Sequence, residues 1–334
     1  MPNNLQEIFD AFSHSTRKSM LAMCKEEIPT LAPFAKGSRP QESFAVAALI
    51  GLTSNSVRGS VGIYFPKKVF CGLISSMMGE PVKSIEKENE DAATELLNII
   101  YGDAKVFLNE RGYGIQMALP SLLRGGNVVS PGSKLLEIIV IPFTTQWGEF
   151  YVEFSLAPSK NPKVAGGAPS GPIVPMTNSE KAGFFKPFIE STIKTFKTQF
   201  TLDVTTGTPS SKKGSDAFSF DIAGIIGVTS HRLTGSYMVS FKKDVYLKLL
   251  SKMLGETFTE IQPGFEDAVA ELLNIILGGA KVVLNDQLGH SIEMALPSLV
   301  YGESVRSAQQ PGKTALLIPF YSDIGRFMVE VAID

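Results

Sequence analysis

Apolar positions along the chain follow a helical period in some stretches and a strand-like pattern in others. Apolar side chains recur every three or four positions in residues 5–28 and again from about Ser179, and this period predicts an amphipathic helix at each place. Two pairs of β-rich runs follow these helices, and each pair indicates a hairpin. The paired runs are Phe44–Leu52 with Gly59–Phe65 and Ile222–Val228 with Gly235–Phe241.

Each predicted hairpin is followed by helices and then by further strands. The short helices Lys67–Met78 and Asp244–Leu254 both end before a glycine, a common residue just past a helix C-terminus. A long amphipathic helix comes next and runs to about Asn109 or Asn285. The strands expected after it are Gly114–Leu119, Leu135–Phe143 and Phe150–Leu156, then Ile292–Leu296, Ala315–Phe320 and Phe327–Ile333. Together these elements predict an α+β fold in which an antiparallel sheet packs against helices.

The order of elements occurs twice because the chain is a tandem duplication. Residues match at a constant offset of 176, as from Asn98 to Asn274, and the offset becomes 177 by Pro297, the equivalent of Pro120. The extra residue falls near Arg111–Gly112, where we expect it to alter a turn. A period this long indicates a repeated domain, not a solenoid. We predict a first domain at 1–156, a linker rich in proline and glycine at 157–178, and a second domain at 179–334.

The long helix carries its polar residues in one line in both halves. At 100° per residue, these residues lie within an arc of roughly 80°, and the opposite side is apolar. The polar residues are Asp91, Glu95, Asn98, Gly102 and Lys105, and then Asp267, Glu271, Asn274, Gly278 and Lys281. The residues predicted to face the core in the first half are Ala93, Leu96, Leu97, Ile100, Ala104 and Phe107.

This polar line is mildly unfavourable for the helix itself. Asp91 and Glu95 are like charges one turn apart, which costs roughly a few tenths of a kcal/mol. Asn98 and Asn274 are weak helix formers at mid-helix positions. A solvated helix face is the simplest interpretation of any single acidic residue here. Repetition of the same unfavourable pattern in both halves favours a surface that contacts a partner.

Composition narrows the classes of function. The formal net charge of −2 gives no basic field for nucleic acid or anionic lipid. Two cysteines without metal-like spacing and three scattered histidines predict neither a disulfide framework nor a metal site. Without a signal peptide or a long apolar run, we expect a cytoplasmic protein with no membrane insertion. No glycine-rich phosphate loop opens a helix, so nucleotide binding has no support.

The pattern Asp-x3-Glu-x2-Asn on a helix, followed some twenty residues later by proline, resembles the signature of the CheX/CheC/FliY family of response-regulator phosphatases. The helix Lys186–Phe196, the Gly-x-Ala-Lys sequence after each asparagine and the Ala-Leu-Pro-Ser strand start are similar to CheX in particular. The likeness covers both halves nearly from end to end. It implies a CheC-like domain in each half and, because CheX resembles a dimer-forming unit, an intramolecular pseudo-dimer.

The resemblance implies hydrolysis of the aspartyl phosphate of a CheY-type response regulator. Asn98 and Asn274 are then expected to position the attacking water, since a carboxamide oxygen accepts a hydrogen bond from water while its NH2 group donates. Glu95 and Glu271 are expected to pair with the lysine of the regulator's site and to fix the register of docking.

The remaining residues of the line have expected roles in docking only. Asp91 and Asp267 are expected to help binding, and Lys105 and Lys281 are either partner contacts or solvated. The resemblance implies no cofactor or metal of the chain's own and a Mg²⁺ ion in the regulator. It also allows a regulatory protein partner.

Two other classes of function remain open from the sequence. A binding module of the same fold, a scaffold or flagellar-switch-like protein, would hold a regulator without hydrolysing its phosphate. Both Glu/Asn pairs are intact, which favours catalysis. An enzyme acting on a small molecule would need a concave polar pocket, which the sequence does not indicate.

Overall fold

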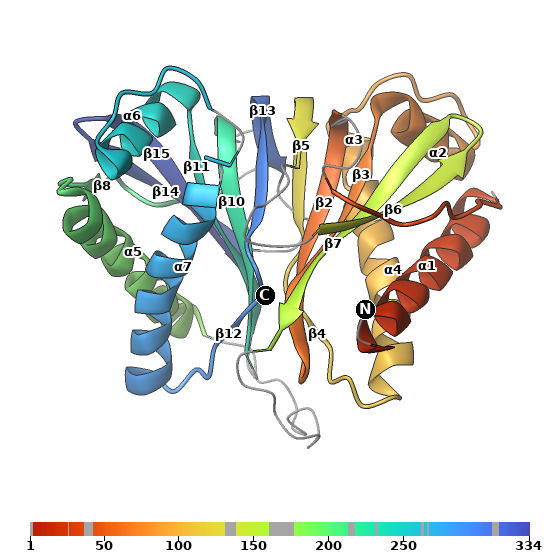
Figure 1. The fold of residues 1–334 in the computed structure, drawn as a ribbon, viewed down its shortest axis with the longest axis horizontal. Coiled ribbons are helices and arrows are strands. Elements are labelled where there is room, and N and C mark those ends of the chain that lie inside the picture. The colour runs from red at the N-terminus through yellow and green to blue at the C-terminus, as the bar shows by residue number, and fades with distance from the viewer. Residues whose placement is uncertain are drawn as a thin grey trace.

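A computed structural model provides the structure of the protein. The residues it describes are 3–25, 27–36, 43–130, 138–159, 177–212, 218–230, 233–261, 264–265, 267–308 and 314–334. Figure 1 shows two similar halves, with strands in the middle of the molecule and the long helices on the two outer sides. The predicted α+β fold is confirmed, because each half is an antiparallel sheet covered by helices.

The predicted elements of the first half occur in the predicted order, with two unpredicted strands and one unpredicted short helix among them. They are α1 (Asn3–Cys24), β1 (Phe34–Ala35), β2 (Phe44–Thr53), β3 (Val57–Phe65), α2 (Lys67–Met78), α3 (Lys87–Glu90), α4 (Ala92–Asn109), β4 (Gln116–Met117), β5 (Ser121–Val129), β6 (Ile138–Thr145) and β7 (Gly148–Pro158).

The second half repeats this order. Its elements are α5 (Asn178–Phe200), β8 (Thr205–Thr206), β9 (Ser210–Ser211), β10 (Ser219–Thr229), β11 (Thr234–Phe241), α6 (Lys243–Leu254), α7 (Asp267–Val282), the π-helical turn η1 (Val283–Gln287), β12 (Glu293–Met294), β13 (Ser298–Ala308), β14 (Thr314–Ser322) and β15 (Gly325–Ile333).

One sheet runs through both halves. Its strand order is β1-β6-β7-β3-β2-β5-β13-β10-β11-β15-β14-β8, and the five strands on each side of the β5–β13 junction are equivalent in the two halves. The counterpart of β1 is β9, which pairs with β14 as β1 pairs with β6. The halves meet where β5 pairs antiparallel with β13. Each long helix packs against the second strand from this junction, α4 on β2 and α7 on β10. The duplication therefore places equivalent helices at equivalent positions on the sheet.

The sequence prediction missed the strands that join the halves. It placed a strand at Gly114–Leu119, whereas the structure has only the two-residue β4 there and starts the long β5 after Pro120. The alternation of β5 is broken by Arg124 and by Gly125-Gly126. Because β5 is flanked by strands on both sides, its backbone pairing holds it in place without a clean apolar pattern.

Two predicted boundaries also differ from the structure. The first helix ends at Cys24, not at residue 28, and Lys25 follows with φ +53°, a left-handed conformation that stops a helix. β7 continues through Pro158, so the first two residues of the predicted linker pair with β3. Most of the remaining linker, residues 160–176, lies outside the described residues.

The two halves pack closely at equivalent residues. The Thr53 and Thr229 hydroxyls lie 3.0 Å apart, and a Cβ atom added to Gly51 would lie 2.7 Å from the Cα atom of Gly227. An apolar cluster contains residues from both halves of the sheet, including Tyr64 from the first half and Met238 from the second. The sheets of the two halves are therefore in direct contact.

Each half also places a buried Lys–Glu pair in the sheet. Lys212 has a fully buried side chain and donates hydrogen bonds to Glu330, at 2.9 and 3.0 Å, and to Ser307 Oγ at 2.7 Å. The equivalent pair in the first half is Lys36 with Glu153. A buried charge of this kind is tolerated only with its partner in place.

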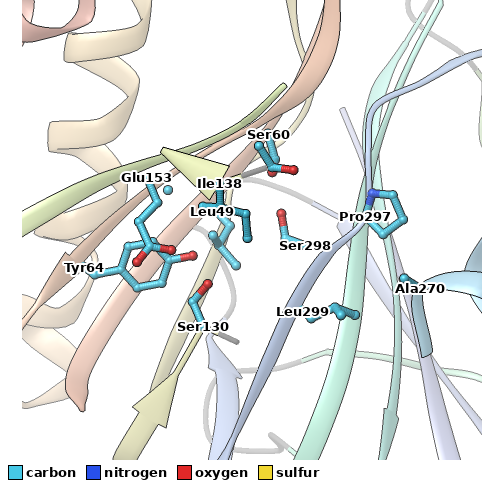
Figure 2. Close-up of a pocket in the computed structure, with 12 residues that line it drawn as sticks. Leu49, Ser60, Tyr64, Ser130, Ile138, Glu153, Ala270, Pro297, Ser298 and Leu299 are labelled. Carbon is cyan, nitrogen blue, oxygen red and sulfur yellow. The ribbon is translucent and has the colours of Figure 1, made fainter. Parts of the chain in front are cut away.

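A small cavity lies beside the pair of the first half. Figure 2 shows Glu153, Tyr64 and Ser130 on one side of it and Ser298 and Leu299 on the other. Burial, and secondly the Glu153 carboxylate, raise the pKa of Tyr64 well above its ordinary value. The cavity has a volume of about 30 Å³, enough for a water molecule or two and too small for an organic substrate.

Candidate functional site

The polar line predicted from the sequence lies on α4 and α7. Asp91 joins α3 to α4 with helical φ and ψ of −66° and −19°, and its carbonyl accepts hydrogen bonds from the N–H groups of Thr94 and Glu95 at 2.9 and 3.0 Å. The polar line of the first half therefore starts at the first turn of a helix that is continuous with α3. Asp267 is the first residue of α7.

The core holds both helices by their apolar sides. Ala93, Leu97 and Ile100 are fully buried, as are Val269, Leu273 and Ile276 at the matching positions. Phe107 was predicted to face the core, but the structure leaves its side chain 41% exposed. It lies at the rim between α1 and α4, where the guanidinium of Arg111 covers the ring at 3.6 Å from its centroid.

The candidate catalytic side chains have no partner within the described part of the chain. Glu95, Glu271 and Asn274 are exposed, and none of the three forms a hydrogen bond or ion pair there. Asn98 is half-buried, and its Oδ1 atom is shielded from water without a hydrogen-bond partner. A shielded acceptor left unpaired costs roughly 1–3 kcal/mol and needs an explanation.

Asp91 adds a second unpaired oxygen to this face. Its Oδ1 atom is buried without a hydrogen-bond partner. Burial, and after it the nearby carboxylates of Glu90 and Glu95, raise the pKa of Asp91, although Lys87 acts in the opposite direction. The ionised form of Asp91 is therefore disfavoured in the folded protein, so at neutral pH this residue lowers the free energy of unfolding.

The lysines at the far end of the line differ between the halves. Lys281 Nζ lies 3.7 Å from Glu293 Oε2, a partly exposed ion pair. Lys105 is half-buried and forms no hydrogen bond or ion pair with the described residues. The residue equivalent to Glu293 is Gln116, so the first half lacks the carboxylate that Lys281 contacts.

Arg124 is a site neighbour that the sequence analysis did not identify. It extends from β5 to the end of α3, just before α4, where its Nη1 atom lies 2.8 Å from Glu90 Oε2. The equivalent residue in the second half is Tyr301. An isolated arginine within a stretch of apolar and small residues was the available signal, but it became interpretable only when β5 was known to lie beside the helix.

The extra residue of the second half is accommodated beyond the polar line. The side-chain amide of Asn109 donates a hydrogen bond to Ile115 O and accepts one from Ile115 N–H. The side chain of Asn285 bonds in the same way to the backbone of Ile292, with one more residue between the two. The helix absorbs that residue by widening into the π turn η1, in which Leu288 N–H bonds to Val283 O at 3.2 Å. The expected change in a turn is confirmed.

Other kinds of site find no support in the described residues. No group of three His, Cys, Asp or Glu side chains among them is arranged to hold a metal ion. None of the helices in that part of the chain has the length and apolar content to cross a membrane. Cys24 and Cys71 are buried, and burial raises the pKa of the Cys71 thiol.

Comparisons with known proteins identify one family. The family model described as chemotaxis phosphatase CheX matches residues 46–144 and 222–321, together more than half of the chain. A solved CheC-like superfamily protein from Shewanella sp. PV-4 is 30% identical, covering 48% of this chain and 99% of its own, with a TM-score of 0.43. CheX from Desulfovibrio desulfuricans is 28% identical, covering 46% and 99%, with a TM-score of 0.42.

A third solved structure is a CheX–CheY–BeF3–Mg²⁺ complex from Borrelia burgdorferi, 21% identical, covering 45% of this chain and 96% of that one, with a TM-score of 0.37. The comparison with curated proteins found no match. The family assignment rests on the family model, which matches once in each half at the same elements. The chain therefore belongs to the CheX family of chemotaxis phosphatases and carries two CheX-like domains in tandem.

Proposed function

We propose that the chain hydrolyses the aspartyl phosphate of a CheY-type response regulator, with Asn98 and Asn274 as catalytic residues. The observation that carries this proposal is the Glu/Asn pair, which has the same spacing in both halves and forms no hydrogen bond or ion pair with the described residues. The membership of the chain in a family of chemotaxis phosphatases supports the reaction class.

The carboxamide suits a reaction whose main need is positioning. Its oxygen accepts a hydrogen bond from the attacking water, and its NH2 group donates to a phosphoryl oxygen. Holding water in line with phosphorus removes much of the entropic part of the barrier, and no covalent intermediate on this chain is needed. The Asn98 Oδ1 atom has no hydrogen bond to break, but it is shielded from solvent in the free protein, so the carboxamide must rotate to present its oxygen to the water.

Glu95 and Glu271 serve docking in this proposal. Each lies one turn before its asparagine and is exposed, so its carboxylate can meet the lysine expected in the regulator's phosphorylation site. The regulator supplies its own Mg²⁺ ion, which neutralises charge on the phosphoryl group. The chain needs no cofactor of its own, and a regulator of this class places the protein in the cytoplasm.

The packing of the halves gives the proposal two separate sites. α4 and α7 lie on opposite outer sides of the sheet (Figure 1), so each is free to meet its own regulator molecule. We regard this packing as an intramolecular pseudo-dimer. The contacts between Thr53 and Thr229 and between Gly51 and Gly227 support this, because each joins a residue to its own equivalent in the other half.

The test separates chemistry from docking. Phosphate release from a purified CheY-type regulator, phosphorylated with acetyl phosphate, is measured at several regulator concentrations. Changing Asn98 and Asn274 together to Ala should reduce kcat to the regulator's own rate while the regulator still binds. Changing Glu95 and Glu271 together to Gln should mainly raise KM. Binding without any acceleration by the unmodified chain would identify a scaffold instead of a phosphatase.

A further inference from the structure

Two glycines on the docking helices have no explanation within the protein itself. Gly102 follows Asn98 by one turn, and Gly278 follows Asn274 by one turn. A Cβ atom added at either position would meet nothing within 4 Å. Glycine inside a helix costs about 1 kcal/mol relative to alanine. Alanine would therefore fit both positions and strengthen both helices, yet each half has glycine.

The next residue of α7, Gly279, is a glycine that packing within the protein does explain. A Cβ atom added at Gly279 would lie 2.4 Å from Ser191 Oγ, because α5 packs against the helix there and Ser191 donates a hydrogen bond to Ile276 O. The equivalent residue of the first half is not glycine but Asp103, which bonds to Ser15 of α1. Packing explains Gly279 in one half only. It does not explain the glycine that occurs in both.

The residues around each glycine are the same in the two halves. The neighbours one turn away are Asn98, Ile99, Lys105 and Val106 in α4 and Asn274, Ile275, Lys281 and Val282 in α7. Val106 and Val282 are 63% and 57% exposed, and Ile99 is 47% exposed. Each glycine has no side chain and therefore leaves a gap on the helix surface, here called the hollow, between apolar side chains on one flank and the proposed catalytic carboxamide on the other.

We infer that Gly102 and Gly278 are docking positions that receive a main-chain segment of the response regulator next to its phosphorylated aspartate. This inference rests on the proposed function and adds a contact to it. Without a Cβ atom, the helix lets a partner's backbone approach closely. The carboxamide one turn earlier must reach the water and the phosphoryl group in line, and a displacement of about 1 Å lowers such a rate strongly.

Filling the hollow with a methyl group should raise the stability of the helix and weaken the docking of the regulator. In a chain whose second site is inactivated by Asn274→Ala, Gly102→Ala should raise the midpoint of thermal unfolding by about 2 °C. The added methyl group should also raise KM for the phosphorylated regulator roughly tenfold, because it overfills a packed contact. Gly102→Leu should raise KM further. A purely structural glycine would not give higher stability together with weaker docking.

Gly183 supplies the matched control. It is exposed in α5, and a Cβ atom there also meets nothing within 4 Å, but its counterpart in the first half is Glu7. Gly183→Ala should stabilise its helix by a similar amount and leave KM unchanged. An equal rise in KM for Gly183→Ala would mean that the effect of Gly102→Ala is not local, and the inference would be wrong.

The remaining outcomes separate this inference from the proposed function. If Gly102→Ala leaves KM and the Kd for the phosphorylated regulator unchanged while Asn98→Ala abolishes hydrolysis, the hollow is not a docking position and the phosphatase stands. If Asn98→Ala leaves hydrolysis intact, the proposed chemistry fails, and the effect of Gly102→Ala on Kd still decides the docking contact. A lower unfolding temperature for Gly102→Ala would assign the glycine a structural role.

Discussion

The contact between Gly51 and Gly227 predicts a sharp sensitivity of the whole chain to one methyl group. In Gly51→Ala, the new Cβ atom would lie 2.7 Å from Gly227 Cα and 2.8 Å from the Ala295 Cβ atom. Non-bonded carbon atoms prefer about 3.5–4.0 Å, so β2 and β10 must separate by roughly 1 Å. Both obstacles are backbone or Cβ atoms that cannot rotate away.

Overpacking of this kind costs about 1–3 kcal/mol. We expect Gly51→Ala to lower the free energy of unfolding by about 2 kcal/mol. Gly227→Ala should have a similar effect, because its Cβ atom would lie 2.6 Å from the Ala118 Cβ atom and 2.7 Å from Gly51 Cα. Either methyl group forces the same two strands apart, so the double variant should lose clearly less than the sum of the single losses.

Urea-induced unfolding of the single and double variants measures these free energies, with Gly183→Ala as the control in which a methyl group meets open space. That control should be as stable as the unmodified chain or slightly more stable. Unchanged stability in Gly51→Ala would refute the close packing of the halves. Fully additive losses would show that the two glycines do not share one contact.

Two further predictions concern buried charge. Lys212→Met leaves the Glu330 carboxylate without its cationic partner and should destabilise the chain by about 3–5 kcal/mol. The double variant Lys212→Met with Glu330→Met should recover most of this loss. Urea unfolding of both variants measures the two free energies, and a mild effect of Lys212→Met would contradict the prediction. Asp91→Asn should stabilise the chain at pH 7, because the raised pKa of Asp91 means that its ionised form is disfavoured in the folded state. In the unmodified chain, the folded state loses stability as pH rises from 3.8 through the raised pKa of Asp91, because the carboxyl must then ionise. The gain in stability of Asp91→Asn should therefore be present at pH 7 and disappear below pH 3.8. A gain that does not depend on pH would contradict the raised pKa.

Sequence reasoning succeeded where a periodic pattern was repeated. The internal repeat and the 3.6-residue period were sufficient to place the line from Asp91 to Lys105 on one side of a helix, opposite its apolar side, because helix geometry fixes which residues are neighbours. The extra residue after Asn285 was expected to alter a turn, and the second half has the π turn η1 there. These features depend on local geometry alone, and local geometry is what a sequence pattern reports.

Features that depend on distant contacts were not predictable in this way. β5 was not predicted because Arg124 and two glycines break its alternation of apolar and polar residues. Its position is fixed by β2 and β13, which are remote in sequence. The exposure of Phe107 depends on how the first turns of α1 pack beside α4. The difference in burial between Asn98 and Asn274 likewise depends on surroundings that the repeated motif does not describe.

Phosphate release by the two single asparagine variants and the double variant tests the account most directly. The phosphorylated CheY-type regulator is mixed with the unmodified chain, with Asn98→Ala, with Asn274→Ala, and with the chain carrying both changes. We predict that each single change removes about half of the acceleration and that the double variant, still folded and still binding the regulator, releases phosphate no faster than the regulator alone. A double variant that accelerates release as well as the unmodified chain does would contradict the claim that these asparagines position the attacking water.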